Sequence, residues 1–376
     1  MSVEKPPVMR KSRISIVAAV AALTICFQGT ASAPASHVGA SAASPKTLLQ
    51  LARGLVKAGA PGALAYVRTP TAVRGAAAGF GTLRPRTALR VNDRYRIASV
   101  TKPFVATVVL KLASEGRLSL EDSIERWLPG LVPNGAAITI RQLLNHTSGL
   151  FEFTADPVWA STLLADPSRT WAPRELLPFG LSHLALFPPG TNWSYSNTNY
   201  VLLGLVIEAA TGKGVAEVLH DRLFGPLALR STTFPTEAAE DGHFAHGYVG
   251  FLGGPLVDSS VLSPTIAYAA GEMVSNAADV TKFFAALMRG KLLPAPQLKD
   301  MKTGSGVSAT YGLGLVLTYT RCGKTFGHEG DFPGWRNITL AKADGRRVAV
   351  VMVNIDTTHV PWRKLQAAAE TALCSG

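Results

Sequence analysis

Ser99 and Lys102 lie three positions apart in a stretch that continues with apolar residues at helical spacing as far as Glu115. This spacing predicts a helix, and because residues i and i+3 of a helix share one face, the Lys102 amine lies beside the Ser99 hydroxyl. Such an amine can act as the base for a serine nucleophile. The spacing alone is weak evidence, since Ser2 and Lys5 repeat it. The alternative is that Ser99 only caps the helix and Lys102 lies on the surface. The apolar helix favours a catalytic pair, because burying a lysine there is costly unless it is neutralised or paired.

Tyr195 and Asn197 form a second candidate pair, just before a helical pattern at 201–211. A phenol can relay a proton if a neighbouring ammonium lowers its pKa, and an amide can hold a substrate carbonyl. Because Ser and Asn are also common helix caps, this stretch taken alone is better interpreted as the polar start of a helix.

His328 is the third candidate, in a His-Glu-Gly sequence that follows a short apolar strand predicted at 325–327. A histidine near a sheet edge can act electrostatically or in proton transfer, although a lone histidine is more often structural. With its ordinary pKa, His328 predicts a change of activity near pH ~6.5.

The elements that must position these residues change in character along the chain. Residues 48–58 predict a helix, and 62–67 and 75–83 predict strands. The middle, about 120–261, mixes helical patterns at 201–211 and 215–223 with Pro-rich and Gly-rich loops, and no strand pattern recurs there. In the C-terminal third, strands are predicted at 311–320, 325–327, 335–342 and 347–354, with a hairpin turn at Asp344-Gly345 and a last helix at 360–373.

Strands at both ends of the chain around a helical middle predict an α/β fold of the α+β type. We expect one antiparallel sheet flanked by helices and formed by both chain ends, residues 45–98 and 262–376, plus a mainly helical domain, residues 99–261. The composition, 47% hydrophobic and 16% charged over 376 residues, supports a large core and excludes disorder.

The N-terminus predicts export. Three basic residues precede an apolar run of 14 residues at 14–27, and small residues follow, which is the layout of a signal peptide. The run is shorter than the ~20 residues that span a bilayer, so no stable membrane anchor is expected. We assign 1–33 to the signal peptide and 34–44 to a flexible leader. Removal of 1–33 lowers the net charge from +12 to +9, and without a basic patch interleaved with aromatic residues no nucleic-acid partner is expected.

Cys322 and Cys374 remain after removal of the signal peptide. An even pair in an oxidising compartment favours a disulfide over two buried thiols. A bridge that closes a loop of this length contributes roughly 4 kcal/mol in the chain-entropy model.

Taken in order, the segments 99–102, 195–197 and 328–330 resemble the three motifs of the serine D-alanyl-D-alanine carboxypeptidases and class C β-lactamases. Three ordered motifs are far more specific than one. The resemblance continues through four further segments and covers most of the mature chain: 96–99, 143–150, 270–273 and 311–314. It implies a β-lactamase/transpeptidase-like fold, and some of those carboxypeptidases have cysteines similarly placed to 322 and 374.

The resemblance implies that Ser99 is the nucleophile and that Lys102 and Tyr195 share proton transfer, without deciding which of the two is the base. The backbone N–H groups of Ser99 and Asp331 would form an oxyanion hole, in which each donor is typically worth ~10²–10³ in rate. Lys302 begins a Lys-Thr-Gly sequence that competes for the third motif, but it ends a polar helical stretch, so we regard it as a chance match.

The same resemblance assigns substrate binding to Asn197, His328 and Gly330. Asn197 would orient the acyl-side amide, and His328 would supply electrostatic support. One departure concerns Glu329 and Asp331, which stand where such carboxypeptidases have hydroxyl residues that bind a terminal carboxylate. Two acids there are expected to repel that carboxylate, and no partner arginine can be identified.

The leading hypothesis is therefore an exported serine hydrolase that forms a Ser99 acyl-enzyme and acts on cell-wall peptides as a D-alanyl-D-alanine carboxypeptidase. The alternatives are an esterase, D-aminopeptidase or β-lactamase of the same fold, or a non-catalytic penicillin-binding or peptidoglycan-binding sensor. The expected partner is a stem peptide, a β-lactam or an ester, and a monomer is expected. The sequence has no Gly-x-Ser-x-Gly elbow, phosphate-binding loop or His/Cys metal spacing, so it predicts neither a cofactor nor a metal.

Overall fold

The computed structural model describes residues 42–238, 243–250, 254–356 and 360–375. The predicted signal peptide, 1–33, lies outside the described residues, as does the leader up to residue 41. The flexible leader predicted at 34–44 extends too far toward the first helix. Ala43 is buried, and the Ser44 hydroxyl accepts a hydrogen bond from the backbone N–H of Thr47 as the N-cap of the first helix. The ordered chain therefore begins no later than Ala43.

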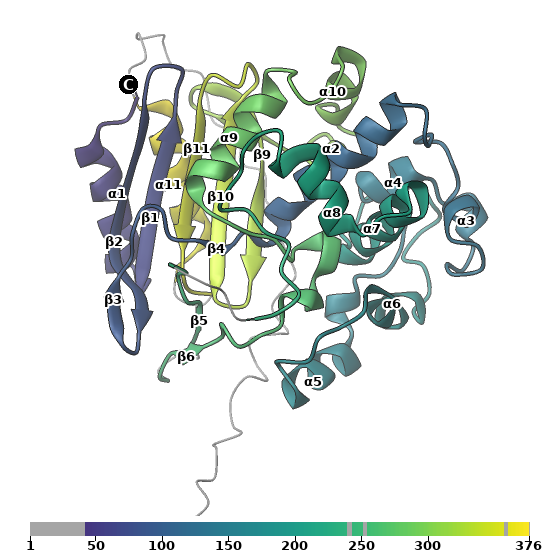
Figure 1. Ribbon diagram of the computed structural model, residues 1–376, viewed down its shortest axis with the longest axis horizontal. Helices are drawn as coiled ribbons and strands as arrows, with labels where there is room; N and C mark the ends of the chain where they lie inside the picture. Colours follow the sequence, from purple (N-terminus) through teal and green to yellow (C-terminus); the bar gives the residue numbers. More distant parts are fainter. Residues whose placement is uncertain (1–41, 239–242, 251–253, 357–359, 376) are drawn as a thin grey trace, which may run out of the picture.

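A seven-stranded sheet occupies the left half of the molecule in Figure 1, and most of the helices lie to its right. Its strands are β1 (Gly62–Arg68), β2 (Val73–Leu83), β3 (Arg86–Ala88), β8 (Val316–Thr320), β9 (Gly323–Phe332), β10 (Trp335–Lys342) and β11 (Val348–Val353). They are arranged in the order β3-β2-β1-β11-β10-β9-β8, and every neighbouring pair is antiparallel. The first and last thirds of the chain thus meet where β1 pairs with β11, which confirms the predicted sheet formed by both chain ends.

Helices cover both faces of the sheet. Side chains alternate between the two faces along each strand, so each face has its own set of apolar residues to bury. On one face, α1 (Pro45–Lys57) and α11 (Trp362–Cys374) pack against the set that includes Ala65 and Val351. On the other face, α2 (Thr101–Ser114) and α9 (Ala277–Met288) pack against the set that includes Leu64 and Val350 (Figure 1). The second face carries the catalytic helix.

The remaining helices lie mostly between the two halves of the sheet in sequence. They are α3 (Ile124–Trp127), α4 (Ile140–Leu144), α5 (Pro157–Ala165), α6 (Pro173–Leu181), α7 (Asn197–Thr211), α8 (Val215–Leu219) and α10 (Ala295–Met301). The middle also contains a short ladder of β5 (Tyr248–Val249) and β6 (Val257–Asp258), which the sequence pattern did not predict. β4 (Tyr95–Arg96) pairs with β7 (Val274–Ser275). The domain boundaries at 99 and 261 stay a prediction.

Two predicted strands differ from those observed. The strand expected at 311–320 begins only at Val316, because Gly314 adopts φ +76° and a Cβ there would lie 2.6 Å from Cβ of Ala106, against helix α2. The strand expected at 325–327 is instead ten residues long and contains the third motif. The polar residues Lys324, His328, Glu329 and Asp331 interrupt the apolar pattern by which a strand is recognised in the sequence.

Cys322 and Cys374 are joined by a disulfide, as predicted, with their Cα atoms 5.6 Å apart. The bridge ties the turn before β9 to the end of α11. Within the described part of the chain, no helix combines the length and apolar composition needed to cross a bilayer.

Candidate active site

Ser99 lies in a single 3-10 turn, Ala98–Val100, that leads directly into α2. Ala98, the residue before it, has φ +52°, a left-handed conformation that is uncommon outside glycine. His146 and Tyr268 share this feature with φ +63° and +40°. Strained residues of this kind tend to gather at functional sites. Here they belong to segments that surround the Ser99 hydroxyl.

Lys102 is fully buried, and its Nζ lies 3.2 Å from Ser99 Oγ, as the helical spacing predicted. Nζ also donates to Asn197 Oδ1 at 2.6 Å and to the Ala270 carbonyl at 2.7 Å. Burial lowers the pKa of Lys102 from 10.5 to about 7, although the nearby Glu152 carboxylate opposes that shift. A neutral amine has two hydrogens for those two acceptors and keeps its lone pair for Ser99.

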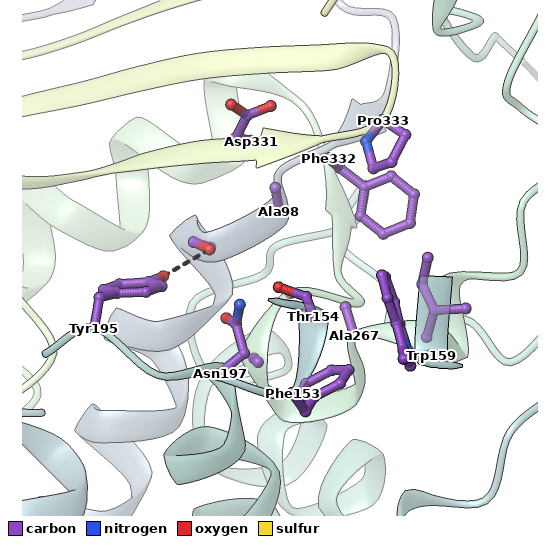
Figure 2. A pocket seen from close by; sticks show the side chains of 14 residues that line it. Ala98, Phe153, Thr154, Trp159, Tyr195, Asn197, Ala267, Asp331, Phe332 and Pro333 are labelled. Carbon is purple, nitrogen blue, oxygen red and sulfur yellow. Dashed lines mark hydrogen bonds between the residues drawn. The ribbon is translucent and has the colours of Figure 1, made fainter. Parts of the chain in front are cut away.

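Tyr195 donates a hydrogen bond from its hydroxyl to Ser99 Oγ at 2.9 Å (Figure 2). Its ring also lies near the amine, with Lys102 Nζ 4.8 Å from the ring centroid. A proton relay through Tyr195 was predicted on the condition that a neighbouring ammonium lowers the pKa of the phenol. The structure contradicts this expectation, because burial raises the pKa of Tyr195 well above 10. The phenol therefore stays protonated and is a donor.

Asn197, the first residue of α7, stands between Lys102 and Glu152. While Oδ1 accepts from Lys102, Nδ2 donates to Glu152 Oε1 at 3.1 Å, and the Asn197 backbone N–H donates to Glu152 Oε2. Glu152 also accepts from the backbone N–H and hydroxyl of Thr154. Glu152 was not among the site residues predicted from the sequence. Its only signal was an acid soon after the segment 143–150, and Asp156, four residues later, gives the same signal.

His328 is a buried residue of β9 on the face of the sheet that is turned toward the site. Its Nε2 lies 3.0 Å from the Tyr311 hydroxyl. Burial, with the charge of Lys102 as a second cause, lowers the pKa of His328 to about 3. The expectation that this ring changes charge near pH 6.5 is therefore wrong. The segments 143–150 and 311–314 contribute His146 and Tyr311 to this region, although the sequence assigned neither residue a role.

Gly330 lets β9 approach the segment that carries Ser99. A Cβ at this position would lie 2.3 Å from the carbonyl oxygen of Ile97, so any side chain would separate the strand from that segment. Ser99 and Asp331 line the same cavity. The oxyanion hole formed by their backbone N–H groups remains a prediction that this arrangement supports.

The carboxylates of Glu329 and Asp331 do not face the substrate, contrary to expectation. Both residues alternate with His328 and Gly330 along β9, and so belong to the opposite face of the sheet. Asp331 Oδ2 lies 3.5 Å from Nε of Arg336, and its carboxylate points away from Tyr195 and Asn197 in Figure 2. Repulsion of a substrate carboxylate by these acids is therefore not supported.

Lys302, the competing third-motif residue, lies away from the site's hydrogen bonds. It is the C-cap of α10, and its ammonium donates to the carbonyl of Ala343. Its interpretation as a chance match agrees with this position.

An open cavity lies in front of Ser99 and Tyr195, with about 510 Å³ of empty space when the solvent at its mouth is included. Much of its wall is apolar or aromatic, as Figure 2 shows for Phe153, Trp159 and Phe332. The complete lining is Ala98, Ser99, Phe153, Thr154, Trp159, Tyr195, Asn197, Ile266, Ala267, Ala270, Gly271, Asp331, Phe332 and Pro333. This described lining contains no lysine or arginine. The arrangement can acylate a serine and hold an apolar group beside it.

Comparison with known proteins agrees with this chemistry. The profile of the family described as Beta-lactamase matches residues 48–372. The chain is 29% identical over 313 residues to penicillin-binding protein 4* of Bacillus subtilis, which covers 78% of this chain and 68% of that protein. It is also 29% identical over 310 residues to a D-aminopeptidase of Brucella anthropi, across 79% of this chain. The chain spans only 56% of that relative's length.

Solved structures give the same picture. A D-stereospecific amidohydrolase from Streptomyces sp. superposes with a TM-score of 0.80 at 37% identity, covering 87% of this chain and 98% of that one. A D-amino acid amidase from Ochrobactrum anthropi SV3, solved with L-phenylalanine amide, has a TM-score of 0.76 at 27% identity and covers 86% and 95%. The buried Ser99 in the turn that leads into α2, the buried Lys102 in the first turn of α2, the three motifs and the family match lead to one conclusion: this chain is a serine hydrolase of the β-lactamase family.

Proposed function

We propose that the chain hydrolyses amides of D-amino acids that have a free amino group and an apolar or aromatic side chain. The observation that supports this most is the cavity in front of Ser99. It has aromatic walls and no basic residue in its described lining, while the Glu152 carboxylate stands behind Asn197. An anionic substrate end finds no lysine or arginine in the described lining. We assign the substrate ammonium to the Glu152 carboxylate, which lies behind Asn197 and outside the lining itself. A D-stereospecific amidohydrolase and a D-amino acid amidase among the similar structures support the same substrate class.

The carboxypeptidase hypothesis is weaker for the same reason. A D-alanyl-D-alanine peptide ends in a carboxylate, and neither the lining nor the inward face of β9 supplies a charged partner for it. Esterase or β-lactamase activity, or binding without turnover, remain the outcomes that the substrate test below distinguishes.

In the proposed reaction, Ser99 Oγ attacks the amide carbon and its proton passes to the neutral Lys102 amine. Lys102 is the base in this scheme because its pKa lies near 7, whereas the pKa of Tyr195 is raised. The C–N bond then breaks, and Tyr195, still protonated, is the donor that we assign to the leaving nitrogen. The proton held by Lys102 restores the phenol, and water hydrolyses the acyl-enzyme.

A matched set of substrates tests the proposal: D-phenylalanine amide, L-phenylalanine amide, N-acetyl-D-phenylalanine amide, a peptide ending in D-alanyl-D-alanine, and a chromogenic cephalosporin. We expect the D-amide to give the highest kcat/KM. A higher value for the peptide or the cephalosporin would replace the proposal by carboxypeptidase or β-lactamase activity. Turnover of none of them, with stable acylation, would favour the sensor.

The variant Glu152→Gln tests the binding of the amino group. We expect kcat/KM for D-phenylalanine amide to fall about ten- to a hundredfold, because a charged hydrogen bond is lost. An ester that lacks an amino group should be hydrolysed at nearly the wild-type rate. Equal losses for both substrates would show that Glu152 only supports Asn197.

Export of the chain is also a proposal, since residues 1–33 lie outside the described residues. The bridge between Cys322 and Cys374 supports it, because disulfides persist in oxidising compartments.

A further inference from the structure

Two buried histidines, His328 in the third motif and His146 in the segment that follows α4, are joined through the phenol of Tyr311. His146 Nε2 lies 3.1 Å from the Tyr311 hydroxyl, and the same hydroxyl lies 3.0 Å from His328 Nε2. All three side chains are buried. The direction of each hydrogen bond between His146, Tyr311 and His328 follows from the groups that contact the Nδ1 atoms of the two histidines.

At the first end, His146 Nδ1 must be an acceptor. It lies 3.2 Å from the backbone nitrogen of Ser196, which can only donate. Nδ2 of Asn199 lies at the same distance, and its amide is oriented because Asn199 Oδ1 accepts from the Ser148 hydroxyl at 2.6 Å. With Nδ1 unprotonated, the hydrogen of a neutral His146 is on Nε2. His146 therefore donates to the oxygen of Tyr311.

At the other end, His328 Nδ1 must be a donor. It lies 2.6 Å from the carbonyl oxygen of Glu329, which can only accept. A neutral His328 then has an unprotonated Nε2, and this nitrogen accepts the hydrogen of Tyr311. The phenol thus accepts from one histidine and donates to the other, so each hydrogen is used once and the two assignments agree.

The charged and titratable groups around His328 disfavour its cation. Lys102 faces it from α2 and repels a positive ring, and the neighbouring phenols of Tyr195 and Tyr311 supply no negative charge because burial keeps them protonated. The Glu329 carboxylate belongs to the opposite face of the sheet. A protonated His328 would also aim a second N–H at the Tyr311 oxygen, which already accepts from His146.

We propose that Tyr311 is a positioning residue that holds His328 as a neutral ring protonated on Nδ1. The same chain of hydrogen bonds fixes His146, whose ring lies 4.4 Å from the ring of Tyr195, centroid to centroid. Tyr311 therefore connects the third motif to the phenol that contacts Ser99. It leaves Lys102 without a second cation beside it. The inference uses the proposed amidase activity only as one readout, because the protonation of the rings does not depend on the substrate.

Nitrogen-15 NMR of the histidine side chains tests the proposal on the full protein. Long-range proton–nitrogen spectra distinguish the two neutral tautomers and the imidazolium, and the variant His328→Gln identifies the signals of that ring by their loss. We expect the Nδ1-protonated neutral tautomer for His328 throughout pH 5–8. An imidazolium at pH 6, or a neutral ring protonated on Nε2, would overturn the proposal even if D-amide turnover is found.

The variant Tyr311→Phe, with Tyr319→Phe as its control, tests the role in catalysis. Tyr319 lies on β8 and is 68% exposed, so its hydroxyl is expected to be dispensable. We expect Tyr311→Phe to alter the Nε2 signal of His328 and to lower kcat about three- to tenfold with little change in KM. Unchanged His328 signals with unchanged kcat would contradict the proposal. If the variant does not fold, the wild-type spectra still decide.

Discussion

Lys102 and Glu152 bind opposite ends of one amide group. The lysine donates to Asn197 Oδ1 at 2.6 Å, and the glutamate accepts from Asn197 Nδ2 at 3.1 Å. Because a carboxylate can only accept from this amide, Glu152 fixes the orientation that turns Oδ1 toward the lysine. Its charge also opposes the fall in the Lys102 pKa that burial causes. The protonation state of the base therefore depends on a residue that contacts neither Ser99 nor Lys102 through a hydrogen bond of its own.

The pH dependence of acylation follows from the Lys102 pKa of about 7. The neutral amine is the base, so kcat/KM rises with pH, is half-maximal near pH 7 and reaches a plateau above it. An ester without an amino group is the right substrate, because the amino group of a D-amino acid amide titrates as well. His328, with a pKa of about 3, contributes no inflection between pH 5 and 8. A rate that falls as the pH rises through 7 would contradict this assignment.

Glu152→Gln should shift that profile to lower pH. Loss of the carboxylate removes the interaction that raises the Lys102 pKa, so the midpoint is expected to fall by about one unit or less. The measurement is the pH profile of ester hydrolysis.

Glu121→Gln is the matched control for this shift. The Glu121 side chain is 64% exposed and pairs with Arg141, outside the site. Its midpoint should equal that of the wild type. A shift to higher pH in Glu152→Gln, or an equal shift in both variants, would show that Glu152 does not act on Lys102.

The disulfide is expected to stabilise the fold with little effect on the site. Replacing Cys322 and Cys374 by serine opens a loop with a sequence separation of 52. The unfolding free energy should then fall by about 4 kcal/mol in the chain-entropy model. Denaturant titration of the wild type and the double variant measures the difference, with ester hydrolysis at 25 °C as the control for an intact site. Coinciding transitions would show that the bridge contributes nothing to stability.

Much of the fold and the centre of the site could be predicted, because both depend on local patterns. The three-residue spacing of Ser99 and Lys102 in one continuous helical segment fixes their proximity, and strands at the two chain ends leave one sheet as the natural arrangement. The position of Tyr195 and Asn197 beside Ser99 followed only from the resemblance of three ordered motifs. Their own sequence is equally typical of a helix cap.

What could not be predicted depends on contacts between distant segments. Glu152 is a single acid without a motif, and its role arises from hydrogen bonds to a residue 45 positions later. The charge state of His328 depends on the burial of its ring and on the nearby charge of Lys102. Neither the burial nor the proximity can be read from the sequence. Glu329 and Asp331 were expected to face the substrate because they flank Gly330 of the third motif. The strand predicted at 325–327 ended before them, so the alternation of their side chains could not be foreseen. The alternation along β9 assigns them to the other face.

Catalysis is expected to proceed through an acyl-enzyme on Ser99. Rapid-quench mass spectrometry of the intact protein during turnover of D-phenylalanine p-nitrophenyl ester tests it most directly, with Ser99→Ala as the test variant. Ser114→Ala is the control, since Ser114 is exposed at the end of α2, the helix that Ser99 precedes. We predict that the wild type and the control gain the mass of one D-phenylalanyl group. Ser99→Ala should gain none and lose at least about 10⁴-fold in rate. An adduct on Ser99→Ala, or turnover by that variant at a wild-type rate, would contradict the account.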